Sequence, residues 1–372
     1  MRSGMQPLLE LLRGKSFDAP VDEAALGALL ALAEEEGVLA LATAHLRGLR
    51  LTLPPAVADS LLRIERDSAI AAFFFSAQLE ALLRAFRQRG IEVVPLKGPC
   101  LAERLYGSAA LRSCRDLDLL VRRADLAQAE ALLREIDFLP DEADDYHRQW
   151  IRGTLTVELH HDVENPLTFD FHVDQAFQRA LPATFQGEPI RQFVPEDELL
   201  YLCLHAAHHR YERLSLVLDL ERALESFAPP PGGWPLREDA AGLGNLLLLG
   251  LAMARRLQPD LSTPVAFSPS KRQTGHVERV ADRLWQQLLG QPSQPLDWSS
   301  VHAFYVEIET PGRPRLRRRW RHIRVLAGRV IDADYAFAAR FGLHRPWQAK
   351  LLRPLRLIVK AIGRPRPGTD AG

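Results

Sequence analysis

The sequence is poor in cysteine: Cys100, Cys114 and Cys203 are its only three in 372 residues. They are widely spaced and odd in number, so they predict neither a disulfide framework nor a Cys-x-x-Cys metal pair. Free thiols fit a reducing compartment, which excludes the class of disulfide-stabilised secreted domains. We therefore expect a cytoplasmic protein.

Long hydrophobic runs are also missing. The longest apolar stretches, such as LLLLGLAMA at 246–254, are shorter than the roughly 20 residues that a membrane-spanning helix needs. The leucines at 8–12 are soon followed by charge, which does not match a signal peptide. Neither an internal repeat nor a coiled-coil heptad is present. With 47% hydrophobic and 25% charged residues, the composition is that of an ordinary globular protein.

Charge is balanced overall but not along the chain. The 47 Lys and Arg residues match 47 Asp and Glu residues, yet residues 313–366 hold sixteen basic residues and two aspartates, a local charge of +14. This basic tail is either a solvated helical face, an amphipathic element on an anionic membrane surface, or a site for an anionic partner such as a nucleic acid or leader peptide. The protein is thus expected to be cytoplasmic, either free or peripheral to the inner membrane.

Helical and strand patterns divide the chain and predict an α+β protein. Residues 1–90, rich in Ala and Leu at helical spacing, predict a helical N-terminal domain. Residues 91–165 switch to short period-two runs separated by amphipathic helices, which predicts a small α/β unit. A connecting segment is expected at 166–195, a helical C-terminal domain at 196–310, and the basic, partly helical tail at 311–372.

Two aspartates interrupt one predicted strand, RSCRDLDLLVRR. Read with period two, Leu117 and Leu119 lie on one face, while Asp116 and Asp118 share the other. Aspartate is a poor strand former, and two carboxylates this close together repel each other. Such a pair is expected where it holds a cation. The alternative is that the aspartates are solvated residues on a half-buried sheet.

A later stretch, WIRGTLTVELHHDV, is predicted to form one or two antiparallel strands that turn at Gly153. Glu158 and His160 share one face of it. If this strand lies beside the DLD strand, Glu158 converges with Asp116 and Asp118, and three carboxylates suit Mg²⁺. Two such ions, with Mn²⁺ as an alternative, can clamp the attacking and leaving oxygens of a phosphoryl or nucleotidyl transfer.

Four segments together resemble the uncharacterised bacterial nucleotidyltransferase family of the polymerase-β-like superfamily. They are VVPLKGPCLAERLYG, RSCRDLDLLV, VELH and LCLHAAHHRYERLSLVLDL, with a looser match in LRPLRLIVK. The resemblance implies a small nucleotidyltransferase palm in which Asp116 and Asp118 bind both metal ions and Glu158 completes the site beside the acceptor. It also implies an NTP as co-substrate, with ATP as the first expectation.

The resemblance places the nucleotide phosphates near Gly98, the glycine after the first strand. Classical members of the superfamily carry Gly-Ser or Gly-Gly closer to the DxD pair, whereas here Gly98 and Pro99 stand eighteen residues before Asp116. Other side chains are therefore expected to grip the phosphates. The candidates are Lys97, Arg112, Ser113 and Arg115. The two arginines can instead be structural partners of the aspartates, and Arg115 is predicted to point to the opposite strand face.

The motif HAAHHRY places three histidines on neighbouring turns of a predicted helix. His205, His208 and His209 are spaced for Zn²⁺, but neither an HExxH glutamate nor a cysteine at ligand spacing accompanies them. The resemblance matches His205, His209 and Asp219 to family positions that either line the nucleotide cleft or fix a helix by hydrogen bonds. His160 either orients the neighbouring carboxylate, carries a proton, or has a structural role.

The predicted activity is Mg²⁺-dependent transfer of an NMP group from an NTP to an acceptor hydroxyl or phosphate, with release of pyrophosphate. The acceptor stays open: a small molecule, a peptide, a protein side chain or an RNA end. Two alternatives remain, a kinase-like phosphotransferase at the same site and a catalytically degenerate, antitoxin-like binding protein. Intact Asp116, Asp118 and Glu158 favour an enzyme, whereas Pro99 favours the binding protein. The sequence leaves the base preference and the oligomeric state undetermined.

Overall fold

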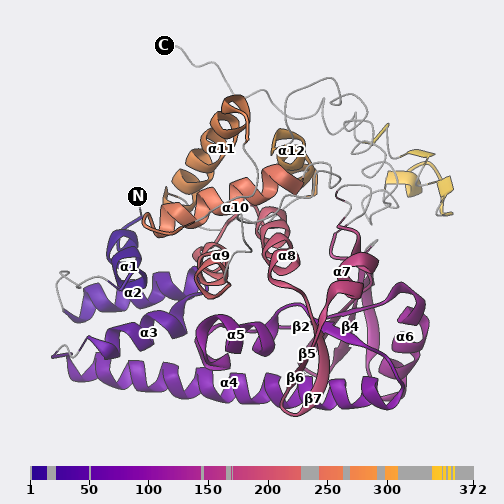
Figure 1. Cartoon of the computed structure of the whole chain (residues 1–372), viewed down its shortest axis with the longest axis horizontal. Coiled ribbons are helices and arrows are strands. Elements are labelled where there is room, and N and C mark those ends of the chain that lie inside the picture. The colour runs from indigo at the N-terminus through magenta and orange to yellow at the C-terminus, as the bar shows by residue number, and fades with distance from the viewer. Residues whose placement is uncertain are drawn as a thin grey trace. The chain divides into compact units, whose positions relative to one another are not determined.

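The chain divides into two compact units, residues 1–310 and 311–372. All labelled helices and strands in Figure 1 belong to the first. The finer domain boundaries stay predictions. The computed structural model describes residues 2–14, 22–49, 52–143, 146–164, 169, 171–227, 243–262, 269–290, 298–308, 337–345, 347–348, 351–352 and 355–356.

The N-terminal region is helical, as predicted. Asp22 caps the second helix by accepting a hydrogen bond from the backbone N–H of Ala25 at 2.8 Å. Pro55 stands at the first position of the fourth helix, where its missing N–H costs nothing. The four helices are α1 (Met5–Leu12), α2 (Glu23–Glu35), α3 (Leu39–Gly48) and α4 (Pro55–Gln88).

A five-stranded sheet follows, in the order β1-β2-β5-β4-β3. Its strands are β1 (Val93–Pro95), β2 (Leu117–Val121), β3 (Leu139–Ala143), β4 (His147–Arg152) and β5 (Leu155–His160). Strands β4 and β5 form the predicted antiparallel hairpin, turning at Gly153 with φ of 61°. Strands β2 and β5 are parallel neighbours, with Asp118 opposite Glu158. The predicted adjacency of the two acidic strands is therefore confirmed.

The two faces of the sheet differ as the period-two pattern predicts. One face packs against the C-terminal half of α4 and against α6 (Leu126–Glu135). The buried side chains of this core include Leu79, Leu82, Leu83 and Phe86 of α4, Leu132 and Leu133 of α6, and Leu117, Leu119, Trp150, Val157 and Leu159 of the strands. Burying each large side chain stabilises the fold by roughly 1.5–3 kcal/mol. The aspartate-bearing face is left for polar side chains.

Residues 166–195, predicted as a connecting segment, hold more structure than that. They include α7 (Val173–Arg179) and a hairpin of β6 (Leu181–Phe185) and β7 (Glu188–Gln192). Gln186 and Gly187 form its two-residue turn, both with positive φ, 48° and 83°. Gln-Gly is a weaker hairpin signal than Asn-Gly, and the strands are short, which explains why the sequence did not indicate this hairpin.

The remaining elements are mostly helical. Helix α8 begins at Pro195, and Glu196, Asp197 and Glu198 occupy its first turn, as predicted. The helices not yet given are α5 (Gly98–Tyr106), α8 (Pro195–His208), α9 (Leu214–Ser226), α10 (Leu243–Leu257), α11 (Lys271–Gly290) and α12 (Trp298–Ile308), with short 3₁₀ turns η1 (Ala109–Leu111) and η2 (Arg123–Asp125).

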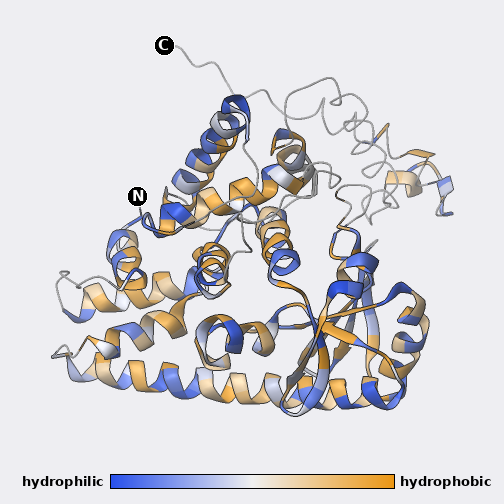
Figure 2. Ribbon diagram, viewed as in Figure 1, coloured by the Kyte–Doolittle hydropathy of each residue, from blue (hydrophilic) through white to orange (hydrophobic). Residues whose placement is uncertain are grey.

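Helix α4 differs from the expectation that apolar stretches of this chain are too short to cross a membrane. It is long and apolar enough to cross a membrane by length and composition, with a mean hydropathy of 1.4 over its best 18 residues, of which 22% are buried. The core helix of a globular protein passes the same test. Figure 2 shows blue residues interspersed with orange ones along α4. Its apolar residues are interrupted by polar ones, so a search for uninterrupted apolar runs does not find this helix.

Candidate active site

The polar face of the sheet gathers side chains from three neighbouring strands. The parallel register of β2 and β5 sets Asp118 opposite Glu158. On the other side of β5, the hairpin register sets Gln149 opposite Glu158 and His147 opposite His160. Because side chains on directly paired residues point to the same face, these five lie together.

Asp118 lies between two basic side chains. Its side chain is 1% exposed, and its Oδ1 atom lies 3.0 Å from Nζ of Lys97 and 3.3 Å from Nε2 of His160. Burial alone would raise the pKa of Asp118, but the charge of Lys97 and the hydrogen bond from His160 outweigh it and hold that pKa far below its usual range. Burial lowers the pKa of Lys97 while Asp118 raises it, and the net shift is upward. Asp118 and Lys97 are therefore a charged pair.

His160 bridges the two acidic strands. Its Nε2 atom lies 3.4 Å from Oε2 of Glu158 as well as close to Asp118, and its Nδ1 lies 3.3 Å from the backbone oxygen of Asp162. Burial opposes its protonation, yet the hydrogen bonds to the two carboxylates raise its pKa to about 9. His160 is therefore an imidazolium near pH 7, which makes the orienting role the one that its contacts support.

The neighbours on β4 complete this arrangement. Gln149 donates a hydrogen bond from Nε2 to Oε1 of Glu158 at 2.9 Å. The ring of His147 stacks on that of His160, with centroids 4.9 Å apart and an interplanar angle of 22°. Burial, followed by the charge of His160, lowers the pKa of His147 to about 4, so this ring is neutral. Sequence reasoning missed both residues, although a hairpin at Gly153 already fixes this register.

Asp116 is less tightly held than its partner. It precedes β2 and is half-buried. Burial, followed by repulsion from Asp118, raises its pKa to about 6. Glu158 behaves in the opposite way: burial disfavours its charge, but the hydrogen bond from His160 outweighs burial and lowers its pKa. The site thus holds more negative charge than Lys97 and His160 comfortably offset.

These side chains fit a divalent cation. Asp118, Glu158 and His160 each offer a ligand atom within 4.8 Å of the others, and within the described ranges this is the one such group of three. Oδ2 of Asp118 is buried without a hydrogen-bond partner, so a carboxylate oxygen is open to a ligand. Carboxylate oxygens suit Mg²⁺ and Mn²⁺. His160 lies within this cluster, but as an imidazolium it has no lone pair for a cation, so the ligand atoms would come from the carboxylates of Asp118 and Glu158. Asp116, the other predicted ligand, stands two residues before Asp118 in the sequence.

Gly98 marks the start of α5, as the predicted phosphate position requires. Its φ of 70° is one that L side chains rarely adopt, and a Cβ there would meet Leu117 Cδ2 at 3.5 Å. Lys97, the residue before it, supplies the ammonium that contacts Asp118. The N-terminus of a helix attracts anions through its free N–H groups, although Pro99 contributes none. Gly98 and Lys97 thus border the acidic cluster.

Arg112 contacts a buried carboxylate, and its predicted phosphate-gripping role stays a prediction. Its Nε and Nη2 atoms donate to the carboxylate of Asp219, with N–O distances of 2.9 to 3.1 Å. The hydroxyl of Tyr106 donates a further hydrogen bond to Asp219 at 2.7 Å. The pair joins the segment before β2 to α9, so Asp219 takes the helix-fixing role. The two residues stand 107 positions apart, and no pattern in the sequence links them.

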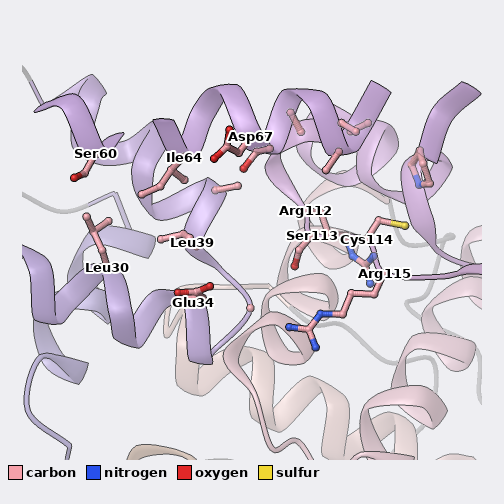
Figure 3. Close-up of a pocket in the computed structure, with 18 of the residues that line it drawn as sticks. Leu30, Glu34, Leu39, Ser60, Ile64, Asp67, Arg112, Ser113, Cys114 and Arg115 are labelled. Carbon is pink, nitrogen blue, oxygen red and sulfur yellow. The ribbon is translucent and has the colours of Figure 1, made fainter. Parts of the chain in front are cut away.

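Ser113 and Arg115 border a pocket of about 690 Å³. The pocket lies between α2, α3 and α4 on one side and residues 109–115 on the other, and Figure 3 shows Glu34 and Asp67 among its lining. Arg115 and Glu34 are exposed, and neither makes an ion pair or side-chain hydrogen bond in the part of the chain that the structure describes. The sequence did not indicate that the N-terminal helices contribute to a pocket beside the DLD strand.

The three histidines at the end of α8 contact one another, with the ring of His209 lying 4.8 Å from that of His205 and 5.3 Å from that of His208, and each has further neighbours of its own. Burial, followed by the charge of Lys97, holds the pKa of His205 well below its usual range, and its ring stacks on Tyr201. His208 Nδ1 lies 3.0 Å from Oε2 of Glu164. His209 lies 3.8 Å from Glu212. They do not form a metal-binding group among the described residues, so the zinc alternative gains no support.

The chain belongs to a family described as uncharacterised nucleotidyltransferase, whose model matches residues 22–259, more than half of its length. The predicted resemblance is confirmed, and the protein is a transferase with an α+β fold. A comparison with curated protein sequences finds no match.

Two solved structures show distant likeness. A crystal structure of ANT(2″)-Ia in complex with adenylyl-2″-tobramycin is 15% identical, with a TM-score of 0.34, and the match covers 49% of this chain and 97% of that one. An antigenic nucleotidyltransferase-like protein from Paracoccidioides brasiliensis is 17% identical, with a TM-score of 0.36, covering 50% of this chain and 89% of that one. The assignment rests on the family match.

Proposed function

We propose that this nucleotidyltransferase uses Mg²⁺ to transfer an NMP group from an NTP, with ATP as the first candidate, to a hydroxyl or phosphate of its acceptor. The observation that carries the proposal is the pair of carboxylates on adjacent parallel strands, Asp118 and Glu158. Their pKa values are lowered, and an open oxygen of Asp118 is available to a cation. Cations held at such a site would offset the negative charge of a triphosphate.

Each side chain has a distinct part. Asp118 and Glu158 would hold the cation, and Asp116 would join them as a ligand or as a second carboxylate nearby. Mg²⁺, when bound, would neutralise triphosphate charge and make the acceptor hydroxyl easier to deprotonate. Lys97 adds positive charge beside Asp118, and His160 fixes both carboxylates by hydrogen bonds. Because the site is largely buried, its effective dielectric constant is lower than that of water, which strengthens each of these interactions.

The proposed reaction is an in-line displacement. The acceptor oxygen forms a bond to the α-phosphorus, the bond from that phosphorus to the bridging oxygen of the β-phosphate breaks, and pyrophosphate leaves. The acceptor proton passes to Glu158 and then to solvent. Gln149 and His160 hold the Glu158 carboxylate in a fixed orientation, with one hydrogen-bond contact on each oxygen, and its lowered pKa keeps it ionised and ready to accept a proton.

The pocket beside residues 109–115 offers a place for the acceptor. Its apolar lining includes Leu30, Leu39 and Ile64, and carboxylates come from Glu34 and Asp67. A volume of about 690 Å³ lies within the range of small-molecule sites. The carboxylates favour an acceptor that carries an amine or guanidinium group, whether as a free small molecule or as a side chain of a peptide.

Titration calorimetry and labelled nucleotides test the proposal. The purified chain should bind an NTP only with Mg²⁺ present, and the Asp116→Asn/Asp118→Asn variant should lose that binding. With a pool of amine-bearing alcohols as acceptors, the α-phosphate label should reach the product. Transfer of the γ-phosphate label instead would establish a phosphotransferase. Nucleotide binding that needs no metal and persists in the double variant would defeat the assignment of the acidic cluster.

A further inference from the structure

Exposed apolar side chains concentrate on one helix. Among the described residues up to 310, six large hydrophobic side chains are exposed, and four of them belong to α4. These are Leu62, Ile70, Phe73 and Phe74, with exposed fractions of 52%, 61%, 78% and 39%. Scattered exposed apolar residues are ordinary, but a run of them along one helix marks an interaction surface. Figure 1 shows α4 as the long helix along the lower edge of the view.

The outward face of α4 has a regular composition. Its opposite face is already occupied, because Ile64 and Ser68 line the pocket while Leu79 and Leu82 lie in the sheet core. Steps of three and four residues along the outward face trace one line of side chains. This stripe is Asp59, Leu62, Arg66, Ala69, Phe73, Ala77, Glu80, Arg84 and Arg87, each exposed or half-buried.

The stripe is complementary to its own reverse. When α4 is turned end over end about Phe73, Arg66 falls opposite Glu80. In the same register Asp59 falls opposite Arg87, so oppositely charged side chains face each other at both of these pairs of positions. At the centre, the Phe73 rings of the two copies meet at the two-fold axis, and the small side chains of Ala69 and Ala77 on either side leave room for them. Leu62 falls opposite Arg84 in this register. Because a two-fold axis relates the two copies, each of these contacts between different residues occurs twice in the interface.

We infer that the protein self-associates through its α4 helices, which pack antiparallel about Phe73 with a second copy of the chain as the partner. The 34 residues of α4 extend about 50 Å, which suffices for an interface of standard size. Ile70 and Phe74 flank the stripe and become buried in the same contact. Self-association is independent of the proposed chemistry.

Most of the charged side chains of the stripe already have a partner within one copy. Glu80 forms an ion pair with Arg84 on the same helix, so Arg66 of the second copy would be its second partner. Asp59 has no ion pair or side-chain hydrogen bond among the described residues. Arg87 donates to Glu188 at 2.8 Å, and Arg66 contacts only the neighbouring Asp67. A guanidinium carries five N–H donors, so each arginine can accept a second carboxylate as partner. The alternation of acidic and basic side chains also distinguishes the stripe from a membrane-binding face, which would be basic throughout.

The first experiment measures the mass of the full-length protein in solution by light scattering on a sizing column, from micromolar to tens of micromolar. The wild type should be a dimer, and Phe73→Asp should be a monomer. The matched control is Leu139→Asp, which changes another exposed hydrophobic residue, 71% exposed on the edge strand β3, and should stay dimeric. A monomeric wild type, or a Phe73→Asp variant that remains fully dimeric, would overturn the inference.

Charge reversal then tests the register. Arg66→Glu and Glu80→Arg should each weaken the dimer, by about tenfold or more in Kd, because each places like charges opposite one another twice. The double variant restores opposite charges and should recover most of the affinity. Recovery would confirm the antiparallel register, and equal weakening in the double variant would exclude it. Circular dichroism checks that each variant is folded. Flotation of a monomeric wild type with phosphatidylserine vesicles, lost in Phe73→Asp, would assign the face to a membrane and overturn the dimer.

Discussion

Five ionisable side chains share the polar face of the sheet and decide its chemistry. Asp116, Asp118 and Glu158 supply negative charge, and Lys97 and His160 supply positive charge. Neither cation is free, because both contact Asp118 within 3.3 Å. Removing any one of the five therefore alters the protonation of the others as well as its own contribution.

Asp118 is the residue whose loss should matter most. Asp118→Asn leaves Lys97 and His160 without the carboxylate that they share, and it removes the ligand oxygen proposed for the cation. We expect transfer of the α-phosphate label to fall by roughly 10³-fold or more, since charge stabilisation in such a site is a dominant contribution to the rate. The control is Asp141→Asn, an exposed aspartate on β3, which should keep full activity. Equal turnover by Asp118→Asn and the wild type would remove Asp118 from the mechanism.

Glu221 makes stability depend on pH. This side chain of α9 is 4% exposed, and burial raises its pKa to about 7. Between its unfolded pKa near 4.3 and about 7, the folded state binds a proton that the unfolded state does not, so stability falls as pH rises through this window. Glu221→Gln should therefore be more stable than the wild type at about pH 8, by on the order of 1–3 kcal/mol.

Urea unfolding at several pH values measures this difference. The gap between Glu221→Gln and the wild type should shrink as the pH is lowered toward 5, where Glu221 is protonated in the folded protein. Glu142→Gln, which changes an exposed glutamate on β3, serves as the matched control. A wild type and variant with identical pH profiles would contradict the raised pKa.

Elements are joined at a few polar contacts between segments distant in sequence. The bridge between Arg112 and Asp219 is one of these, since it ties the segment before β2 to α9 with both side chains largely buried. Such a contact fixes where α9 lies relative to the acidic cluster.

Loss of one partner of this bridge should cost stability. Arg112→Met leaves the Asp219 carboxylate buried with only the Tyr106 hydroxyl, and we expect the free energy of unfolding to fall by about 3 kcal/mol or more. Arg112→Met/Asp219→Leu should recover part of the loss, because no buried charge remains. Denaturant unfolding measures both. If Arg112→Met instead keeps its stability but loses nucleotide affinity, the phosphate-gripping role is correct and the structural role is wrong.

At the scale of the whole molecule, charge is unevenly distributed along the sequence, with the basic excess near its C-terminal end. Residues 313–366 carry +14 in a protein of zero net charge and pI about 7.2, so the preceding residues are acidic overall. These basic residues fall almost entirely outside the described residues, and their three proposed roles stay open. A solvated tail acts on its surroundings through its own charge over about a Debye length, roughly 10 Å at 0.1 M salt.

Ion exchange tests whether the tail is solvated. At pH 7 and low salt, the intact protein should bind a cation-exchange matrix in spite of its zero net charge, and it should elute as salt screens the basic residues. A variant ending at Thr310 should pass through. If the intact protein also passes through, the basic residues are neutralised within the molecule, and a membrane or nucleic-acid role for the tail loses its basis.

Local rules alone determined much of the first unit. Helices with apolar residues at spacings of three and four, the Gly153 hairpin, and the alternation of Leu117, Asp118 and Leu119 all depend on neighbours within a few residues, which the sequence displays. The predicted carboxylate site required the DLD strand and the Glu158 strand to be neighbours, and the structure shows that β2 and β5 pair in parallel. The resemblance carried the remaining assignment of family and chemistry. What the sequence by itself determined was thus the α+β class, the acidic strands and the class of enzyme.

The tertiary structure decided how distant residues combine. It placed Arg112 on Asp219, stacked His147 on His160, and set Glu34 across a pocket from Arg115. It also showed that the outer face of α4 is exposed. Each of these facts depends on packing between elements separated by dozens of residues, where many pairings satisfy the same local preferences. Burial and charge select among those pairings only in three dimensions, when residues distant in the sequence come together. This is the physical reason that the sequence did not show them.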